Sequence, residues 1–275
     1  MHEKKNESLI SIIMPVYNAE QYIITSVESV IHQSHRDWEL LIINDGSTDD
    51  TEKIIIGFKD SRIRYYSQKN KGVSYARNVG LKNMKGHFFC FLDADDYFPT
   101  RSLEYRILKL NKNPDIDYLD GRVDIYDQNL VRKIDYWLPT YQGNPLIPLL
   151  NISNTCFFSP TWMIRRKPNK TYRFHEGLSH GEDLLFLIEL ALEGGRYDFI
   201  EETIMHYRRG HCSAMNDLKG VEYGYQYIFN SIKNLYGVTP IQVRNFKRIA
   251  RNIIFKSYLG NYQLKNAIIS LVKKW

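Results

Sequence analysis

The sequence has few cysteines and no long apolar segment. Its 275 residues include three cysteines, Cys90, Cys156 and Cys212, and no two of them form a Cys-x-x-Cys pair. So small and odd a number excludes a disulfide framework, and the missing pair argues against a zinc site built on thiolates. Segment 1–8 is polar, unlike a signal peptide, and no apolar run approaches the roughly 18 residues of a membrane span. A reducing, cytoplasmic location is therefore expected.

Repeats and biased segments are also missing. The 16 glycines and 9 prolines follow no fixed period, and no unit of roughly 20 to 50 residues recurs. These absences exclude collagen-like chains, solenoids and propellers. The composition, with 43% hydrophobic and 25% charged residues, is that of a folded globular protein. The length fits one large domain, or a domain with an appendage.

Acidic residues are absent from the last part of the sequence. No Asp or Glu follows Glu222, whereas nine Lys and Arg residues do. Because the net charge of the whole chain is +6, residues 1–222 carry −3. The pI of about 9.0 therefore reflects the C-terminal segment. This distribution argues against a nucleic-acid-binding body and indicates a basic appendage that meets an anionic partner.

Strands and helices alternate along the first hundred residues. Apolar runs predict strands at 11–15, 38–43, 62–68 and 88–92, and the segments between them predict helices, the first opening near Asn18 and the others at 49–58 and 72–84. This order predicts an α/β fold with a mostly parallel sheet covered by helices on both faces. Later segments predict a helix at 100–110, a strand at 118–126, an irregular stretch at 142–168, a helix at 184–192, a strand at 199–208 and helix from 216 onward.

Polar residues gather where the predicted strands end, the edge at which such sheets bind ligands. Asp93, Asp95 and Asp96 directly follow one strand. Their carboxylates suit Mg²⁺ or Mn²⁺, or they form an acidic helix N-terminus. Asp45 ends another strand, where it either accepts hydrogen bonds from a base or ribose or forms an Asx turn. Tyr17 either stacks on a nucleobase or packs at its strand end.

Three further candidates lie outside those strand ends. Arg77, inside a predicted helix, either contacts a nucleotide or is a solvated arginine. Asp183, with Glu182, stands at a predicted helix start, where a carboxylate either acts as a general base or caps the helix. His211 lies in a polar loop beside two arginines, where it either completes a metal or phosphate site or is simply exposed.

Several motifs then follow one another in a familiar order. They are SIIMPVYN at 11–18, LLIINDGSTD at 40–49, NKGVSYARNVG at 70–80 and FLDADD at 91–96, continued by Glu182-Asp183 and the segment 207–213. With these motifs the chain resembles the inverting family 2 glycosyltransferases with the GT-A fold. The resemblance is close over residues 8–100, thinner to about 215, and absent beyond.

The resemblance implies a domain plan. Residues 1–215 would form the GT-A domain, with a Rossmann-like nucleotide-sugar half at 8–100 and an acceptor half at 101–215. Residues 216–275 would form a helical, basic C-terminal extension.

The resemblance also implies roles for single residues. The positions that it assigns to the nucleotide are Pro15, Tyr17, Asp45, Arg77 and Asp93. Asp95 would bind a divalent cation, Mn²⁺ or Mg²⁺, and His211 could reach the metal or the diphosphate. Asp183 would be the catalytic base. Asn44 departs from the pattern, which often has a second Asp there.

The implied activity is the transfer of a sugar from a nucleotide-sugar donor, by resemblance UDP-linked, to an acceptor hydroxyl. The implied acceptor is a glycan or a lipid-linked glycan in the synthesis of a surface polysaccharide or glycolipid. One base and no second carboxylate nucleophile imply a single displacement with inversion.

The sequence disfavours three other functions. A sugar nucleotidyltransferase and a nicotinamide dehydrogenase both want a glycine-rich loop after the first strand, and Met14 to Tyr17 contain no glycine. A non-catalytic nucleotide-sugar-binding module would not need both Asp95 and Asp183.

The basic C-terminal segment has two interpretations. Phe246, Ile249 and Ile253 would share one face of a helix, with basic residues largely on the others. Such a helix could associate peripherally with the inner face of a membrane, near a lipid-linked acceptor. It could equally pack on the body with a solvated basic face.

Overall fold

The computed structural model describes residues 8–210, 217–273 and 275. An eight-stranded mixed sheet forms its centre, in the order β3-β2-β1-β4-β7-β5-β6, with β8 paired to β5. The strands are β1 (Ile10–Val16), β2 (Trp38–Asn44), β3 (Ile63–Ser67), β4 (Phe88–Phe91), β5 (Tyr118–Tyr126), β6 (Lys133–Trp137), β7 (Met163–Arg165) and β8 (Tyr197–Arg208). The helices are α1 (Ile23–Ile31), α2 (Thr51–Gly57), α3 (Val73–Asn83), α4 (Ser102–Lys112), α5 (Leu146–Leu150), α6 (Glu182–Leu192), α7 (Leu218–Ile232), α8 (Pro240–Gly260) and α9 (Leu264–Val272).

The first four strands are parallel, as the alternating pattern predicts. Every residue of β1 and β2 is buried because helices cover both faces of the sheet. Ile12 belongs to the same buried cluster as Val27 of α1 and Leu103 of α4. Its neighbour Ile13 points the other way, into the cluster that contains Ala76 of α3. The chain thus forms the predicted α/β sheet, and β1 lies between β2 and β4, where the strand order reverses.

Three expectations for local structure were wrong. The first helix begins at Ile23 rather than near Asn18, because Asn18 takes a left-handed backbone with φ of 48°. The stretch 142–168 holds α5 and β7, which are only five and three residues long and leave little periodicity. The strand β6 was not predicted, since four of its five residues are exposed and polar residues break its apolar pattern.

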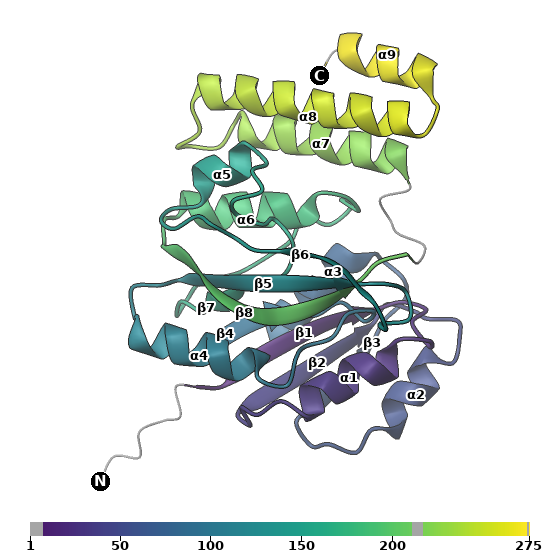
Figure 1. The fold of residues 1–275 in the computed structure, drawn as a ribbon, viewed down its shortest axis with the longest axis vertical. Helices are drawn as coiled ribbons and strands as arrows, with labels where there is room; N and C mark the ends of the chain where they lie inside the picture. The colour runs from purple at the N-terminus through teal and green to yellow at the C-terminus, as the bar shows by residue number, and fades with distance from the viewer. Residues whose placement is uncertain (1–7, 211–216, 274) are drawn as a thin grey trace.

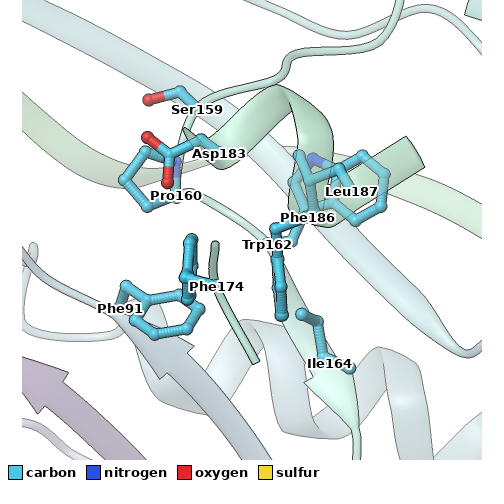
Figure 2. Close-up of a pocket in the computed structure, with 9 residues that line it drawn as sticks. All are labelled: Phe91, Ser159, Pro160, Trp162, Ile164, Phe174, Asp183, Phe186 and Leu187. Carbon is cyan, nitrogen blue, oxygen red and sulfur yellow. The ribbon is translucent and has the colours of Figure 1, made fainter. Parts of the chain in front are cut away.

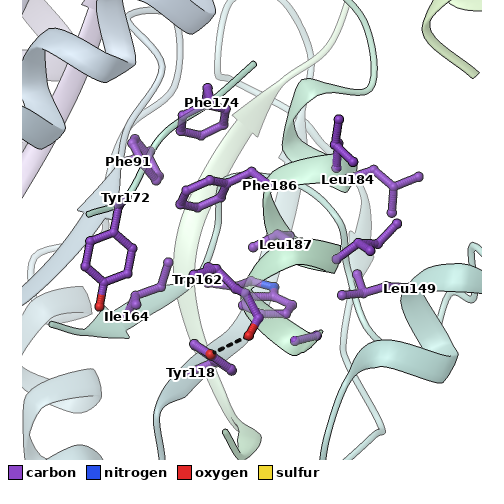
Figure 3. Close-up of a cluster of buried hydrophobic side chains, with 14 of the residues drawn as sticks. Phe91, Tyr118, Leu149, Trp162, Ile164, Tyr172, Phe174, Leu184, Phe186 and Leu187 are labelled. Carbon is purple, nitrogen blue, oxygen red and sulfur yellow. Dashed lines mark hydrogen bonds between the residues drawn. The ribbon is translucent and has the colours of Figure 1, made fainter. Parts of the chain in front are cut away.

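The C-terminal helices pack on the body of the protein. Figure 1 shows α7 and α8 lying above α5 and α6, with α9 outermost. Ile228 of α7 and Phe246 of α8 belong to the same buried cluster as Leu184 of α6, part of which Figure 3 shows. The buried stripe of α8 is Phe246, Ala250, Ile254 and Tyr258. Of the face that the sequence offered to a membrane, Phe246 is buried and Ile249 and Ile253 are half-buried, so α8 matches the second interpretation, a helix packed on the body.

Glycines bring α7 close to the turn that precedes α6. A Cβ at Gly220 would lie 2.6 Å from the His180 ring, and one at Gly224 would clash with the His180 carbonyl oxygen. Gly181, with φ of 74°, follows in the left-handed region, and a Cβ there would lie 2.8 Å from Ile228. The start of α6 is therefore held by α7.

Candidate active site

The loops after β1 and β2 are tied together at the carboxyl edge of the sheet. The Asn18 side chain accepts a hydrogen bond from the backbone of Thr48 (2.8 Å), and the Asn18 backbone donates to Ser47 Oγ (3.0 Å). Pro15 is buried just before this point, whereas Tyr17 is 51% exposed. The Tyr17 ring is therefore open to stacking rather than packed at its strand end.

Asp45 shapes the neighbouring loop. It is buried, and its carboxylate accepts hydrogen bonds from the backbones of Lys71 (2.9 Å) and Gly72 (2.8 Å) and from the side chain of Gln68 (2.7 Å). The Asx turn that was the alternative for Asp45 is made instead by Asn44, whose Oδ1 accepts from the Ser47 backbone at 2.9 Å. Asp45 thus fixes the 68–72 loop at the rim where the nucleotide is expected.

The three aspartates after β4 lie in a loop that β8 holds. Asp96 is buried and accepts a hydrogen bond from the Arg208 backbone (2.9 Å), while Arg208 Nε donates to the Asp95 carbonyl (2.9 Å). The Asp93 side chain is 36% exposed and Asp95 is half-buried. Burial raises the pKa of Asp96 well above its usual value, and the charges of Asp95 and Asp93 raise it further. The loop therefore concentrates negative charge.

This donor set fits a hard divalent cation. Carboxylate oxygens are ligands of Mg²⁺ and Mn²⁺, and the negative charges of Asp93 and Asp95, which raise the pKa of Asp96, are charges that a cation would offset. Among the described residues no three His, Cys, Asp or Glu side chains are grouped to enclose a metal. A cation on Asp93 and Asp95 would therefore share its shell with substrate phosphates and water, as Mg²⁺ usually does. The predicted ligand His211 lies outside the described residues.

Arg77 is buried beneath these loops, so the alternative of a solvated helix arginine is wrong. Its side chain is 3% exposed. Its guanidinium donates to Asp183 (2.8 Å) and Glu182 (3.1 Å) through Nη1 and to Asp93 (3.1 Å) through Nη2. Burial alone would lower the pKa of Arg77, but the carboxylates of Asp183, Asp93 and Glu182 raise it above its usual value. The Arg77 guanidinium thus joins Asp93 and Asp183, which belong to motifs far apart in the sequence.

Asp183 lies in the first turn of α6, where its side chain is 21% exposed. The N-cap residue of this helix is Gly181, and the Asp183 carboxylate bonds to Arg77 instead of capping the helix. Figure 2 shows Asp183 above the rings of Phe91 and Phe174. Burial raises the pKa of Asp183 well above its usual value, while Arg77 opposes the rise. A carboxylate whose pKa is raised in this way binds a proton more readily than one in water.

An aromatic cavity of about 610 Å³ opens beside Asp183. The Trp137 ring lies 5.5 Å from Tyr207 and 6.0 Å from Phe157, measured between ring centroids. Tyr136, Phe158, His180 and Glu182 complete much of the lining. The sequence predicted 142–168 only as an irregular stretch, and it gave no indication of Tyr136 and Trp137, because they belong to the unpredicted strand β6.

Comparison with known sequences finds one family. The family model described as glycosyl transferase family 2 matches residues 11–173. An uncharacterized glycosyltransferase of Haemophilus influenzae is 34% identical over 198 residues, which cover 68% of this chain and 74% of that protein. UDP-Glc:alpha-D-GlcNAc-diphosphoundecaprenol beta-1,3-glucosyltransferase WfgD of Escherichia coli is 40% identical over 127 residues, covering 46% of this chain and 50% of WfgD. Matches with three rickettsial glycosyltransferases span 16% to 18% of their length, so this chain corresponds to a part of those proteins.

Solved structures share the fold. TarS 1–349 of Staphylococcus aureus, in complex with UDP-GlcNAc, superposes with a TM-score of 0.72 at 20% identity, over 94% of this chain and 79% of that one. The mannosyltransferase PcManGT of Pyrobaculum calidifontis, in complex with GDP-Man and Mn²⁺, gives a TM-score of 0.62 at 16% identity, over 96% and 74%. At these identities the likeness establishes the GT-A architecture of the sheet and its helices.

Proposed function

Since this chain belongs to glycosyl transferase family 2, we propose that it transfers a sugar from a UDP-linked donor to an acceptor hydroxyl with inversion at the anomeric carbon. One observation carries the proposal: Arg77 pairs with Asp93 on the donor side and with Asp183 on the acceptor side. Because the base and the donor-binding carboxylate pair with the same arginine, they are held at a fixed separation. A direct displacement requires such a fixed arrangement.

The donor would bind at the rim formed by the loops after β1, β2 and β4. In this proposal Tyr17 stacks on the base, Pro15 and Asp45 shape its pocket, and Asp93 faces the ribose. The names of two similar proteins support a UDP-linked sugar, since WfgD is described as using UDP-Glc and TarS was solved with UDP-GlcNAc.

A divalent cation would be held by Asp95, with Asp93 beside it and His211 as a candidate ligand. When bound, such a cation neutralises negative charge that develops on the leaving diphosphate. The Mn²⁺ in the PcManGT complex supports this part of the proposal.

Asp183 would act as the general base. Its carboxylate takes the proton of the acceptor hydroxyl, the hydroxyl oxygen forms the bond to the anomeric carbon, and the bond to the diphosphate breaks on the opposite side. The neighbouring carboxylate of Glu182 is less accessible, with a side chain that is 10% exposed against 21% for Asp183. This difference supports a single displacement with inversion over a covalent intermediate.

The acceptor would occupy the aromatic cavity beside Asp183. Cavities of this size, lined by aromatic rings with a few polar groups, suit organic ligands with both apolar and polar faces, such as sugar rings. The proposed acceptor is a glycan or a lipid-linked glycan, and in the second case the reaction would take place at a membrane surface. No nucleic acid partner is part of this proposal.

The test is a donor screen. The purified chain is incubated with UDP-, GDP- and TDP-sugars, with Mn²⁺ or EDTA, and released nucleoside diphosphate is measured. We expect metal-dependent release from one donor and its loss in Asp95→Ala. With an acceptor present, Asp183→Asn should lower transfer by roughly 10²- to 10⁴-fold while donor affinity stays unchanged.

A matched control and two contrary outcomes complete the design. Glu201→Gln changes an exposed carboxylate on β8 and should leave every rate unaltered. Donor binding without release under any condition would support a non-catalytic binding module. Release of pyrophosphate from a nucleoside triphosphate and a sugar phosphate would identify a nucleotidyltransferase. Transfer by Asp183→Asn at nearly the wild-type rate would reject Asp183 as the base.

A further inference from the structure

The outermost helix, α9, presents its large apolar side chains to the outside. The residues that it buries are small, Ala267 and Ser270. Its outward residues are Leu264, Ile268, Leu271 and Val272, which are 60%, 55%, 45% and 75% exposed. A surface helix normally has the opposite arrangement, with large apolar residues inside and polar residues outside. This outward apolar face therefore has a use other than packing within the chain.

The exposed residues form one continuous stripe. Positions 264, 268, 271 and 272 follow the spacing of three and four residues that places side chains on one side of a helix. Two more exposed apolar residues lie just before α9 along the chain, Leu259 (46% exposed) at the end of α8 and Tyr262 (98% exposed) in the turn that follows. Scattered apolar residues on a surface are ordinary, but a contiguous apolar face marks an interaction site.

The positive charge near this face indicates which kind of partner binds there. No Asp or Glu follows Glu222 in the sequence, and Glu222 itself, which reaches the end of α9, is paired with Lys273 at 2.7 Å. The exposed residues Lys256 on α8 and Lys265 on α9 carry further positive charge. A second copy of the chain would bring like charges together at this face. Nucleic acid would meet the lysines but leave the aliphatic stripe in water. An anionic lipid surface satisfies both features, since it accepts aliphatic side chains below its headgroups and attracts lysines.

We propose that the outward face of α9, with the turn at 259–262, docks the protein on an anionic lipid surface. This site differs from the α8 segment that the sequence suggested, because α8 turns its apolar stripe inward. The inference goes beyond the proposed transfer reaction and does not depend on it, because lipid binding is measured without any donor or acceptor.

Sedimentation with vesicles tests the proposal on the full chain. We expect binding to phosphatidylcholine vesicles that contain phosphatidylglycerol, weakened by salt, and little binding to pure phosphatidylcholine. The double variant Ile268→Asp with Val272→Asp should bind at least about tenfold more weakly, because it places charge in the apolar stripe. Lys265→Glu should weaken binding to the anionic vesicles by reversing one charge. Val131→Asp, an 82% exposed position in the turn between β5 and β6, is the matched control and should bind like the wild type.

Three outcomes would overturn the proposal. The first is a wild-type chain that does not bind the anionic vesicles. The second is a double variant that binds as tightly as the wild type while keeping its melting temperature. The third is a dimer in sedimentation velocity that the double variant separates, which would make this face a contact between two copies. Donor turnover in all variants distinguishes failure here from failure of the proposed function.

Discussion

The guanidinium of Arg77 donates a 2.8 Å hydrogen bond to the carboxylate of Asp183. The same side chain holds Asp93 and Glu182, so one buried cation stands among three carboxylates. Removing one partner of a buried charge network costs far more than removing an exposed pair, because the remaining charges stay buried. Arg77 is therefore expected to position the base as well as to stabilise the fold.

The variant Arg77→Lys should show whether Arg77 positions the base or binds the nucleotide. A lysine has one compact ammonium group and cannot present the flat fork that reaches three carboxylates. We expect kcat for transfer to fall by roughly 10- to 100-fold with little change in the KM for the donor. Arg62→Lys, whose arginine pairs with Asp60 near the surface, is the control. A raised donor KM with unchanged kcat would instead support the contact with the nucleotide that the sequence suggested.

Transfer should depend on pH through Asp183. Burial raises the pKa of Asp183 above that of an ordinary carboxyl group. Only the ionised form can accept a proton, so the rate should fall as the pH drops through this raised pKa. Because Arg77 lowers the pKa of Asp183, Arg77→Lys should move the acidic limb to higher pH if its ammonium lies farther away. A rate profile that is flat down to the usual carboxyl range would contradict the assignment.

Gly224→Ala should disturb the base from a distance. The added Cβ would meet the carbonyl oxygen of His180, so either α7 or the turn before α6 must move. We expect a loss of roughly 1–3 kcal/mol in unfolding free energy, together with slower transfer. Gly260→Ala is the matched control, since a Cβ there meets nothing within 4 Å. Equal behaviour of the two variants in urea unfolding and in transfer would show that the close approach is not required.

Trp137→Ala should weaken the binding of the acceptor and leave the binding of the donor unchanged. Its ring forms part of the cavity beside Asp183 and lies near Tyr207 and Phe157. Loss of the stacking surface should raise the acceptor KM by about tenfold and leave metal-dependent donor hydrolysis unchanged. Tyr236→Ala, at a fully exposed position, is the control. A changed donor affinity would place the donor rather than the acceptor in this cavity.

Asp120 should make the fold less stable as the pH rises. Burial raises the pKa of Asp120 to about 6, against an ordinary value of 3.8. The folded state therefore binds a proton more tightly than the unfolded state, and this stabilisation is present at low pH and lost as the pH passes about 6. Relative to Asp120→Asn, the wild type should lose about 2–3 kcal/mol between pH 4 and pH 7. Urea unfolding of both proteins at the two pH values measures the difference, and a constant gap would refute it.

The sequence predicted the fold of residues 8–100 better than that of residues 101–215. The strands β1, β2 and β4 are mostly apolar and fully buried and are followed by polar clusters, so both the sheet and its rim follow from local pattern. The pairing of Arg77 with Asp183 joins residues 106 positions apart and leaves no periodic signal. The three residues of β7 are too few for any pattern, and β6 is mostly exposed.

Which face of a helix is buried was harder to predict than the helix itself. In α8 the sequence placed Phe246 with Ile249 and Ile253, whereas the structure buries Phe246 with Ala250 and Ile254. Both sets of residues have the spacing of one helix face. Which set is buried depends on the position of the neighbouring helices, which the sequence alone does not give. In α9 the large residues lie outside, so the rule that apolar side chains face the core gives the wrong side.

The close approach of α7 to the turn at His180 and Gly181 makes the C-terminal helices part of the reaction centre's support. A chain cut at residue 215 would lose that support along with part of the buried cluster. If docking on lipid moves α7 so that the acceptor binds more tightly beside Asp183, thermodynamic linkage requires the converse: the bound acceptor strengthens lipid binding by the same factor. Such a protein would hold the surface most firmly while its acceptor is in place.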